Sequence, residues 1–316
     1  MGIPLIFGHD VIHGYKTIFP IPLAESSSWD LDLMEQSARV AGSEASADGL
    51  NWTFAPMVDI SRDARWGRVM EGAGEDPYLG SLAAKARVKG FQGDDLNDIS
   101  TIVACAKHFA GYGFSEAGRD YNTTDFNHYT LHNTIMPPFK AAVDAGVRTF
   151  MNSFNTLDEI PATGHKYIQR DVLKGDWKFD GFIVSDWGSI DQMIPHGFAR
   201  DGNHAAELAV NAGSDMDMES SLYVSQLAGL VKSGKVDEEK INDAVRRILR
   251  VKYELGLFDD PYKYCNQERS DLELGSKDNM NIALDAAKKS IVLLKNNNQL
   301  LPLPKSGEKI AIIGPL

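Results

Sequence analysis

Acidic and aromatic side chains stand together in the segment GFIVSDWG, which spans residues 181–188. Residues 182–185 are predicted to form a short strand buried on both faces, and Asp186 and Trp187 lie at its end, before Gly188. A carboxylate in this position can attack an anomeric carbon, and an indole provides an apolar platform for a sugar ring. An aspartate that only caps the next helix explains the segment equally well, so the other strand ends must decide.

Further polar residues follow the other predicted strands. They are Asp10, Arg65, Arg68, Lys107, His108 and Asp217, with Phe154 adding a second aromatic surface. Short carboxylates, Arg and Lys bind vicinal hydroxyls through charge-assisted hydrogen bonds. The set therefore favours a carbohydrate site. Arg65 has a structural alternative, in which it pairs with Asp63 or Glu71 and braces its own loop.

Other chemistries fit the sequence less well. Lys107 at a strand end keeps open a lyase that works through a Schiff base. His9 and His13 are four residues apart, but they lie in a strand and its loop, so we expect no metal there. The segment GAGED at 72–76 is too short and too acidic for a phosphate-binding loop, and no cofactor is expected.

Strands and helices alternate along the chain, which is typical of a parallel α/β fold. The predicted strands span 3–8, 52–58, 101–107, 147–151, 182–185 and 213–218, and the main predicted helices span 29–49, 78–90, 129–145, 165–174, 205–211, 221–233 and 237–255. Polar residues at every strand end favour a (β/α)8 TIM-type barrel, which needs eight strands. We expect its first units to precede Met1; an open, doubly wound sheet is the alternative.

The composition changes after Phe258. Residues 259–275 are polar and are predicted to be a linker, 276–294 an amphipathic helix and 309–316 a fresh strand. We therefore expect a barrel domain over 1–258, a linker over 259–275 and the first helix and strand of a truncated second α/β domain over 276–316.

Composition limits the partners. Of 316 residues, 43% are hydrophobic and 24% charged, the formal net charge is −12 and the pI is about 5.1. Such acidity argues against nucleic acid or an anionic membrane as partner and favours a neutral or cationic ligand. The chain has only two cysteines, so we expect no disulfide framework. No apolar run approaches the roughly 18 residues of a membrane span. The oligomeric state is not indicated.

Taken together, the motifs of the chain resemble glycoside hydrolase family 3, in particular its bacterial β-glucosidase branch. The resemblance runs from Gly2 to Leu316 and rests on GHDVIHG (8–14), FPIPLA (19–24), APMVDISRDARWGRVMEGAGEDPYL (55–79), KHFAGYG (107–113), MNSFN (151–155), GFIVSDWG (181–188), LFDDPY (257–262) and SIVLLKN (290–296). Ala110 and Tyr112 replace the Pro and His of the hexosaminidase branch, which argues against that activity.

The resemblance implies a role for each matching residue. Asp186 would be the nucleophile of a retaining mechanism and Trp187 a wall of its subsite. Asp10, Arg68, Lys107 and His108 would hold the hydroxyls of the terminal sugar. Phe154 stands where many relatives carry Tyr, and Met218, beside Asp217, would lie at the last strand end.

The resemblance also implies an activity. We expect a retaining exo-β-glucosidase that acts on β-glucosides or cello-oligosaccharides, with a general acid/base that lies outside this chain. Glu71, Glu75, Glu116 and Glu219 are candidates for that role by residue type only. A β-xylosidase and a carbohydrate-binding fragment without turnover are the alternatives. Periplasmic or secreted localisation is expected by analogy with relatives.

Overall fold

Parallel pairing links six segments in the order in which they occur in the chain. The computed structural model describes residues 2–307 and 309–314. It has parallel strands at β1 (Gly8–His9), β2 (Trp52–Thr53), β3 (Cys105–Phe109), β5 (Thr149–Asn152) and β8 (Phe182–Val184). Isolated parallel bridges join Trp52 to Val103 and Val184 to Met216, which completes the series. The fold is TIM-barrel-like α/β, as predicted.

Side chains alternate across these strands because successive residues of a strand point to opposite faces. Val103 and Cys105 pack in one cluster with Trp52 and with Val251 of helix α8 (Glu238–Glu254). The residues between and beside them, 102, 104 and 106, pack in the main core against helices α2 (Leu31–Ala47), α3 (Pro77–Gln92) and α5 (Met136–Asp144). The sheet is thus buried on both faces, as its near-continuous apolar runs predict.

The helices end close to their predicted limits. Besides those named above, the structure contains α1 (Pro22–Ser26), α4 (His128–Thr130), α6 (Gly202–Ala212) and α7 (Leu222–Lys232), and π-helical segments over Leu131–Ile135 and Tyr167–Asp176. Side-chain caps explain several starts: Asp30 accepts a hydrogen bond from the Leu33 N–H at 3.0 Å. At the end of α8, Gly256 takes a φ of 71°, which suits glycine in a helix C-cap.

The structure shortens several of the predicted strands. The predicted strand 52–58 keeps a strand at Trp52–Thr53 and a single bridge at Met57. In the predicted strand 3–8, only the end pairs: Gly8 lies opposite Trp52, and the Phe7 carbonyl oxygen accepts a hydrogen bond from the Trp52 N–H at 3.1 Å. Ile3 and Leu5 are 48% and 67% exposed. The apolar run alone predicts a strand, but residues 3–6 pair with no strand among the described residues. The predicted strand 213–218 is reduced to the single bridge at Met216. A small sheet of β4 (Thr123–Thr124), β6 (Thr156–Leu157) and β7 (Ile160–Pro161) was not predicted.

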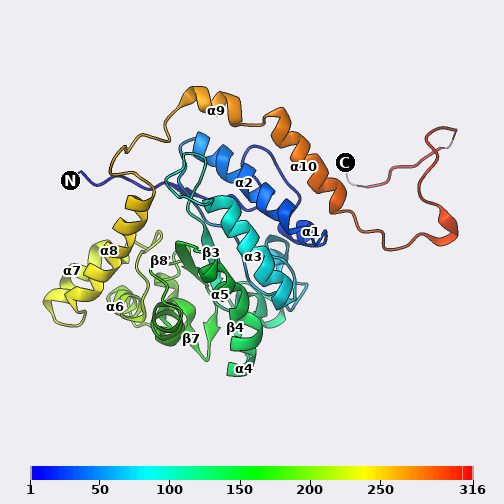
Figure 1. Cartoon of the computed structure of the whole chain (residues 1–316). Helices are drawn as coiled ribbons and strands as arrows, with labels where there is room; N and C mark the ends of the chain where they lie inside the picture. The colour runs from blue at the N-terminus through cyan, green and yellow to red at the C-terminus, as the bar shows by residue number, and fades with distance from the viewer. Residues whose placement is uncertain (1, 308, 315–316) are drawn as a thin grey trace.

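Two further helices follow the barrel and run beside α2 (Figure 1). The predicted linker contains α9 (Gln267–Glu273), and α10 (Lys277–Lys289) ends before the predicted residue 294. Ala283 and Ala286 of α10 pack with Phe19, Leu33 and Val40. The division into domains stays a prediction.

The strand predicted over 309–316 is wrong for residues 309–314, and residues 315–316 lie outside the described part. Ile312 and Ile313 are 81% and 93% exposed. The tail forms a loop beyond the end of α10 (Figure 1), and residues 309–314 pair with no strand among the described residues. No helix of the described residues is long and apolar enough to span a membrane.

Candidate active site

A cavity of about 420 Å³ opens at the carboxyl ends of the parallel strands. Its lining residues are Gly8, His9, Asp10, Phe54, Arg68, Lys107, Met151, Asp186, Trp187 and Met218. These residues come from several strands and the loops after them, so the sheet topology brings together side chains that are far apart in the sequence. Six of the eight predicted site residues line this cavity: Asp10, Arg68, Lys107, Asp186, Trp187 and Met218.

Asp186 lies at the end of β8 and is 8% exposed. Its Oδ1 accepts a hydrogen bond from the Trp187 N–H at 2.7 Å, and its buried Oδ2 has no hydrogen-bond partner. Burial raises the pKa of Asp186 to about 6, against the opposing effects of the Trp187 N–H and the charges of Lys107 and Arg68. The carboxylate is therefore ionised at neutral pH but poorly solvated, which suits a nucleophile.

Lys107 extends from β3 toward the end of β1. It is 3% exposed, and its Nζ donates to Asp10 Oδ1 at 2.8 Å. The Asp10 side chain is 61% exposed, so one carboxylate oxygen remains free for a ligand in the cavity. This pair presents an ammonium donor and a carboxylate acceptor side by side, the arrangement that vicinal hydroxyls need.

Arg68 lies in the 3₁₀ turn Gly67–Glu71, within the long loop after β2. Glu71 accepts two hydrogen bonds from the guanidinium of Arg68, at 2.6 and 3.1 Å, and holds it beside the Tyr112 ring. Arg65 does not line the cavity. It is 71% exposed and pairs with Asp63, which confirms the loop-bracing alternative.

His108 follows Lys107 in β3 but is fully buried and does not line the cavity. Its backbone N–H donates to Asp59 Oδ2 at 2.8 Å, and its Nδ1 lies 2.9 Å from the same oxygen. Its Nε2 lies 3.5 Å from Asp186 Oδ2. Burial, with Arg68 and Lys107 nearby, lowers the pKa of His108 well below its usual value, so the imidazole is neutral.

Trp187 and Phe154 differ in their surroundings. Trp187 is 64% exposed at the cavity edge, where its indole is free to face a ligand. Phe154 is 5% exposed and packs with Met57, Trp66 and Tyr112, so it does not line the cavity. The role assigned to Phe154 by resemblance stays a prediction, and the geometry places this ring behind the site.

Sequence reasoning did not assign several residues that build the site. Phe54 and Met151 add apolar surface to the cavity, and His9 adds an imidazole. Asp59 contacts His108, and Glu71 orients Arg68. Asp59 follows the predicted strand 52–58, and Lys107 ends the next predicted strand. This shared position at a strand end could have marked Asp59 as a candidate site residue.

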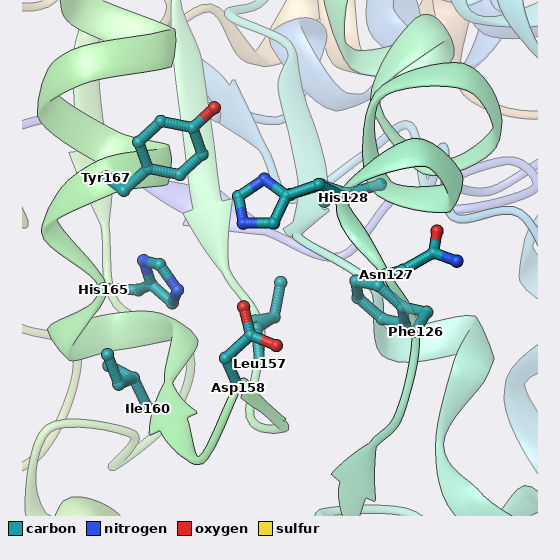
Figure 2. Close-up of a pocket in the computed structure, with 9 residues that line it drawn as sticks. Phe126, Asn127, His128, Leu157, Asp158, Ile160, His165 and Tyr167 are labelled. Carbon is teal, nitrogen blue, oxygen red and sulfur yellow. The ribbon is translucent and has the colours of Figure 1, made fainter.

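A second cavity, of about 160 Å³, lies between α4 and the β6–β7 hairpin. Figure 2 shows Asp158, His128 and His165 converging on it, with Tyr167 and Phe126 at its sides. This second cavity is lined by one carboxylate, and its volume is less than half that of the Asp186 cavity. The Asp186 cavity is therefore the better candidate for sugar chemistry. In the described part of the chain, no three His, Cys, Asp or Glu residues are grouped to hold a metal ion.

Comparisons with known proteins identify the family of this chain. The family model described as the glycosyl hydrolase family 3 N terminal domain matches residues 1–251. The chain is 46% identical to a periplasmic beta-glucosidase of Salmonella typhimurium over 99% of this chain and 41% of that protein. It is 34% identical to a beta-xylosidase of Formosa agariphila, over 100% of this chain and 46% of the relative.

A solved structure extends the similarity to three dimensions. A mutant beta-glucosidase from Listeria innocua, in complex with laminaribiose, superimposes with a TM-score of 0.95 at 45% identity. The match covers 96% of this chain and 42% of that one, so the chain spans less than half the length of these relatives. The family model matches well over half of the chain, and the chain therefore belongs to glycosyl hydrolase family 3.

Proposed function

We propose that this chain carries the nucleophile and the terminal-sugar pocket of a retaining exo-β-glucosidase. The observation that carries the proposal is the position of Asp186, a buried carboxylate beside the exposed indole of Trp187 at the wall of the cavity. Lys107 and Asp10 form a donor and acceptor pair at the same cavity. A beta-glucosidase is also the relative with 46% identity.

Hydrolysis with retention proceeds in two steps. An oxygen of the Asp186 carboxylate bonds to the anomeric carbon while the bond to the leaving oxygen breaks, and a general acid protonates that oxygen. A water molecule then attacks the anomeric carbon, loses a proton to the same group and releases Asp186. During both steps Lys107, Asp10 and Arg68 hold the sugar, and Trp187 packs against its ring.

The acid/base is assigned to a residue outside this chain. Among the described residues, the only carboxylates that line the cavity are Asp10 and Asp186, and Asp10 already pairs with Lys107. Glu71 is engaged with Arg68. Retention needs two carboxyl groups roughly 5–5.5 Å apart, and we propose that a residue outside these 316 supplies the second one.

A β-xylosidase is the second candidate, because two Formosa agariphila relatives, each 34% identical to this chain, are named a beta-xylosidase and a putative beta-xylosidase. Glucose and xylose differ in the hydroxymethyl group. Comparing labelling by matched glucosides and xylosides decides between them. By analogy with the Salmonella typhimurium relative, we also propose a periplasmic location.

The test traps the covalent intermediate on this chain. The probe is an activated fluoroglucoside, in which fluorine replaces the hydroxyl beside the anomeric carbon and dinitrophenolate is the leaving group. Because dinitrophenolate leaves without protonation, the first step needs no acid. We expect mass spectrometry to find one added sugar on the peptide that contains Asp186. Asp186→Asn should abolish it, and the matched surface variant Asp191→Asn should not. Labelling elsewhere, or none, refutes the proposal.

A further inference from the structure

The buried side chains of Asp59, His108 and Asp186 form a continuous chain from the protein interior to the cavity wall. Asp59 is 2% exposed and His108 is fully buried. Asp59 Oδ2 lies 2.9 Å from His108 Nδ1, and His108 Nε2 lies 3.5 Å from Asp186 Oδ2. Both Nε2 and Asp186 Oδ2 are buried and lack a hydrogen-bond partner, and they face each other across this 3.5 Å gap.

The neutral imidazole carries one proton, and its position determines what Asp186 faces. With the proton on Nδ1, a bare Nε2 would face Asp186 Oδ2, and two lone pairs would meet in a buried site. An ionised Asp186 is then disfavoured. With the proton on Nε2, the imidazole donates toward Asp186, and the bare Nδ1 requires a donor from Asp59. Asp59 supplies one only in its protonated form.

We propose that Asp59 and Asp186 share one proton through His108, and that Asp59 holds this proton when Asp186 acts as nucleophile. Asp59 is thus a positioning residue: it touches no substrate and directs the Nε2–H of His108 at Asp186. This inference rests on the proposed function only for the role of Asp186. Two proton shifts along the chain, from Asp59 to Nδ1 and from Nε2 to Asp186, return the proton to Asp186 without changing the net charge.

The surroundings support this distribution of protons. Asp59 is the more deeply buried of the two carboxylates, at 2% against 8% exposed, and lies farther from the cavity, which favours it as the holder of a shared proton. Burial raises the pKa of both groups. The titratable and charged groups that face the chain are Arg68, Glu71, Lys107, Asp10 and Tyr112. Of these, the two cations also keep the imidazole of His108 neutral.

Asp59→Asn distinguishes this proposal from simple charge repulsion by the sign of one shift. An asparagine oxygen can still accept from the His108 backbone N–H, but the imidazole proton is then drawn to Nδ1 and Nε2 is left bare. We expect the pKa of Asp186 to rise, so the rate of labelling by the fluoroglucoside is lost at a higher pH than in the wild type. If Asp59 is instead an ionised neighbour, removing its charge must lower the pKa of Asp186.

The experiment measures the labelling rate against pH for the wild type, Asp59→Asn and the matched control Asp63→Asn, which makes the same change in the nearby loop. We expect an upward shift for Asp59→Asn only. In a His108→Phe background, the Asp59 substitution should produce no further shift, because the link is already broken. A downward shift, no shift, or the same shift without His108 overturns the proposal.

A second readout is independent of catalysis. Nitrogen-15 NMR of the imidazoles, with His108 assigned from its substitution, reports which ring nitrogen carries the proton. Near pH 6.5 we expect Nε2–H in the wild type and Nδ1–H in Asp59→Asn. Nδ1–H in the wild type overturns the inference. If labelling of Asp186 fails in the wild type, the proposed function is wrong, and the NMR result still decides the position of the proton.

Discussion

Replacing Lys107 by methionine separates a role in binding from a role in stability. Lys107 is 3% exposed, yet its partner Asp10 has a side chain that is 61% exposed. Removing the ammonium therefore leaves no buried charge without a partner, because water can solvate Asp10. Methionine has a similar length and fits an apolar environment. We expect the midpoint of thermal unfolding to stay the same or to rise, since a buried amine is replaced by an apolar group.

The effect on the reaction should be large. Lys107 contributes a charge-assisted hydrogen bond, and such bonds contribute about 1.5–3 kcal/mol. At 1.4 kcal/mol per factor of ten, its loss slows glycosylation of Asp186 by about 10- to 140-fold. Because Lys107 also lowers the pKa of Asp186, the acid limb of the rate profile should move to higher pH.

The assay follows the mass of the chain during labelling by the fluoroglucoside, alongside thermal unfolding. Lys140→Met is the matched control, because Lys140 pairs with Asp144 one helical turn away on an exposed face. A surface pair of this kind contributes only about 0.3–0.5 kcal/mol, and labelling should not change. If Lys107→Met is labelled at the wild-type rate, Lys107 does not contact the sugar. A large loss of stability would refute the reasoning about Asp10.

Three other outcomes follow from the same structure. The labelling rate of the wild type should fall about tenfold for each pH unit below the Asp186 pKa of about 6, because only the ionised carboxylate attacks; a flat rate from neutral pH down to pH 5 would exclude Asp186 as nucleophile. Arg87→Met should lower the free energy of unfolding by about 3–5 kcal/mol in chemical denaturation, because it leaves Glu25, whose side chain is 1% exposed, without its ion-pair partner. Gly181→Ala should reduce the melting temperature, because its Cβ would lie 2.0 Å from the Arg148 backbone oxygen; an unchanged value would show that the start of β8 can move.

Residues at strand ends could be placed from sequence because the geometry of a parallel sheet is general. Asp10, Lys107 and Asp186 each follow a different apolar run, and parallel strands bring such positions to one edge. The sequence motifs then indicated the family to which the chain belongs. Phe154 shows the limit of this reasoning, because a residue three positions beyond a strand can turn into the protein or into the cavity. Its burial against Tyr112 depends on the path of the loop, which the spacing does not reveal.

The partnership of Asp59 with His108 was beyond sequence reasoning for a related reason. It requires one carboxylate oxygen to meet both the backbone N–H and Nδ1 of the same residue, at 2.8 and 2.9 Å. Such a contact depends on how strand β3 and the segment after β2 are positioned relative to each other, which the spacing of residues does not reveal. The predicted strand 309–316 failed differently, because local propensity predicts a strand whether or not a neighbour is present to pair with it.

The charges around the cavity explain why Asp186 remains a weakly stabilised carboxylate despite two nearby cations. Each cation already has an acidic partner: Lys107 pairs with Asp10, and Arg68 with Glu71. Their attraction for Asp186 is therefore partly cancelled, and burial prevails in raising its pKa to about 6. A fully stabilised carboxylate would be a poorer nucleophile, and a protonated one would not react. The paired cations can thus bind hydroxyls at the cavity without neutralising the group that attacks the sugar.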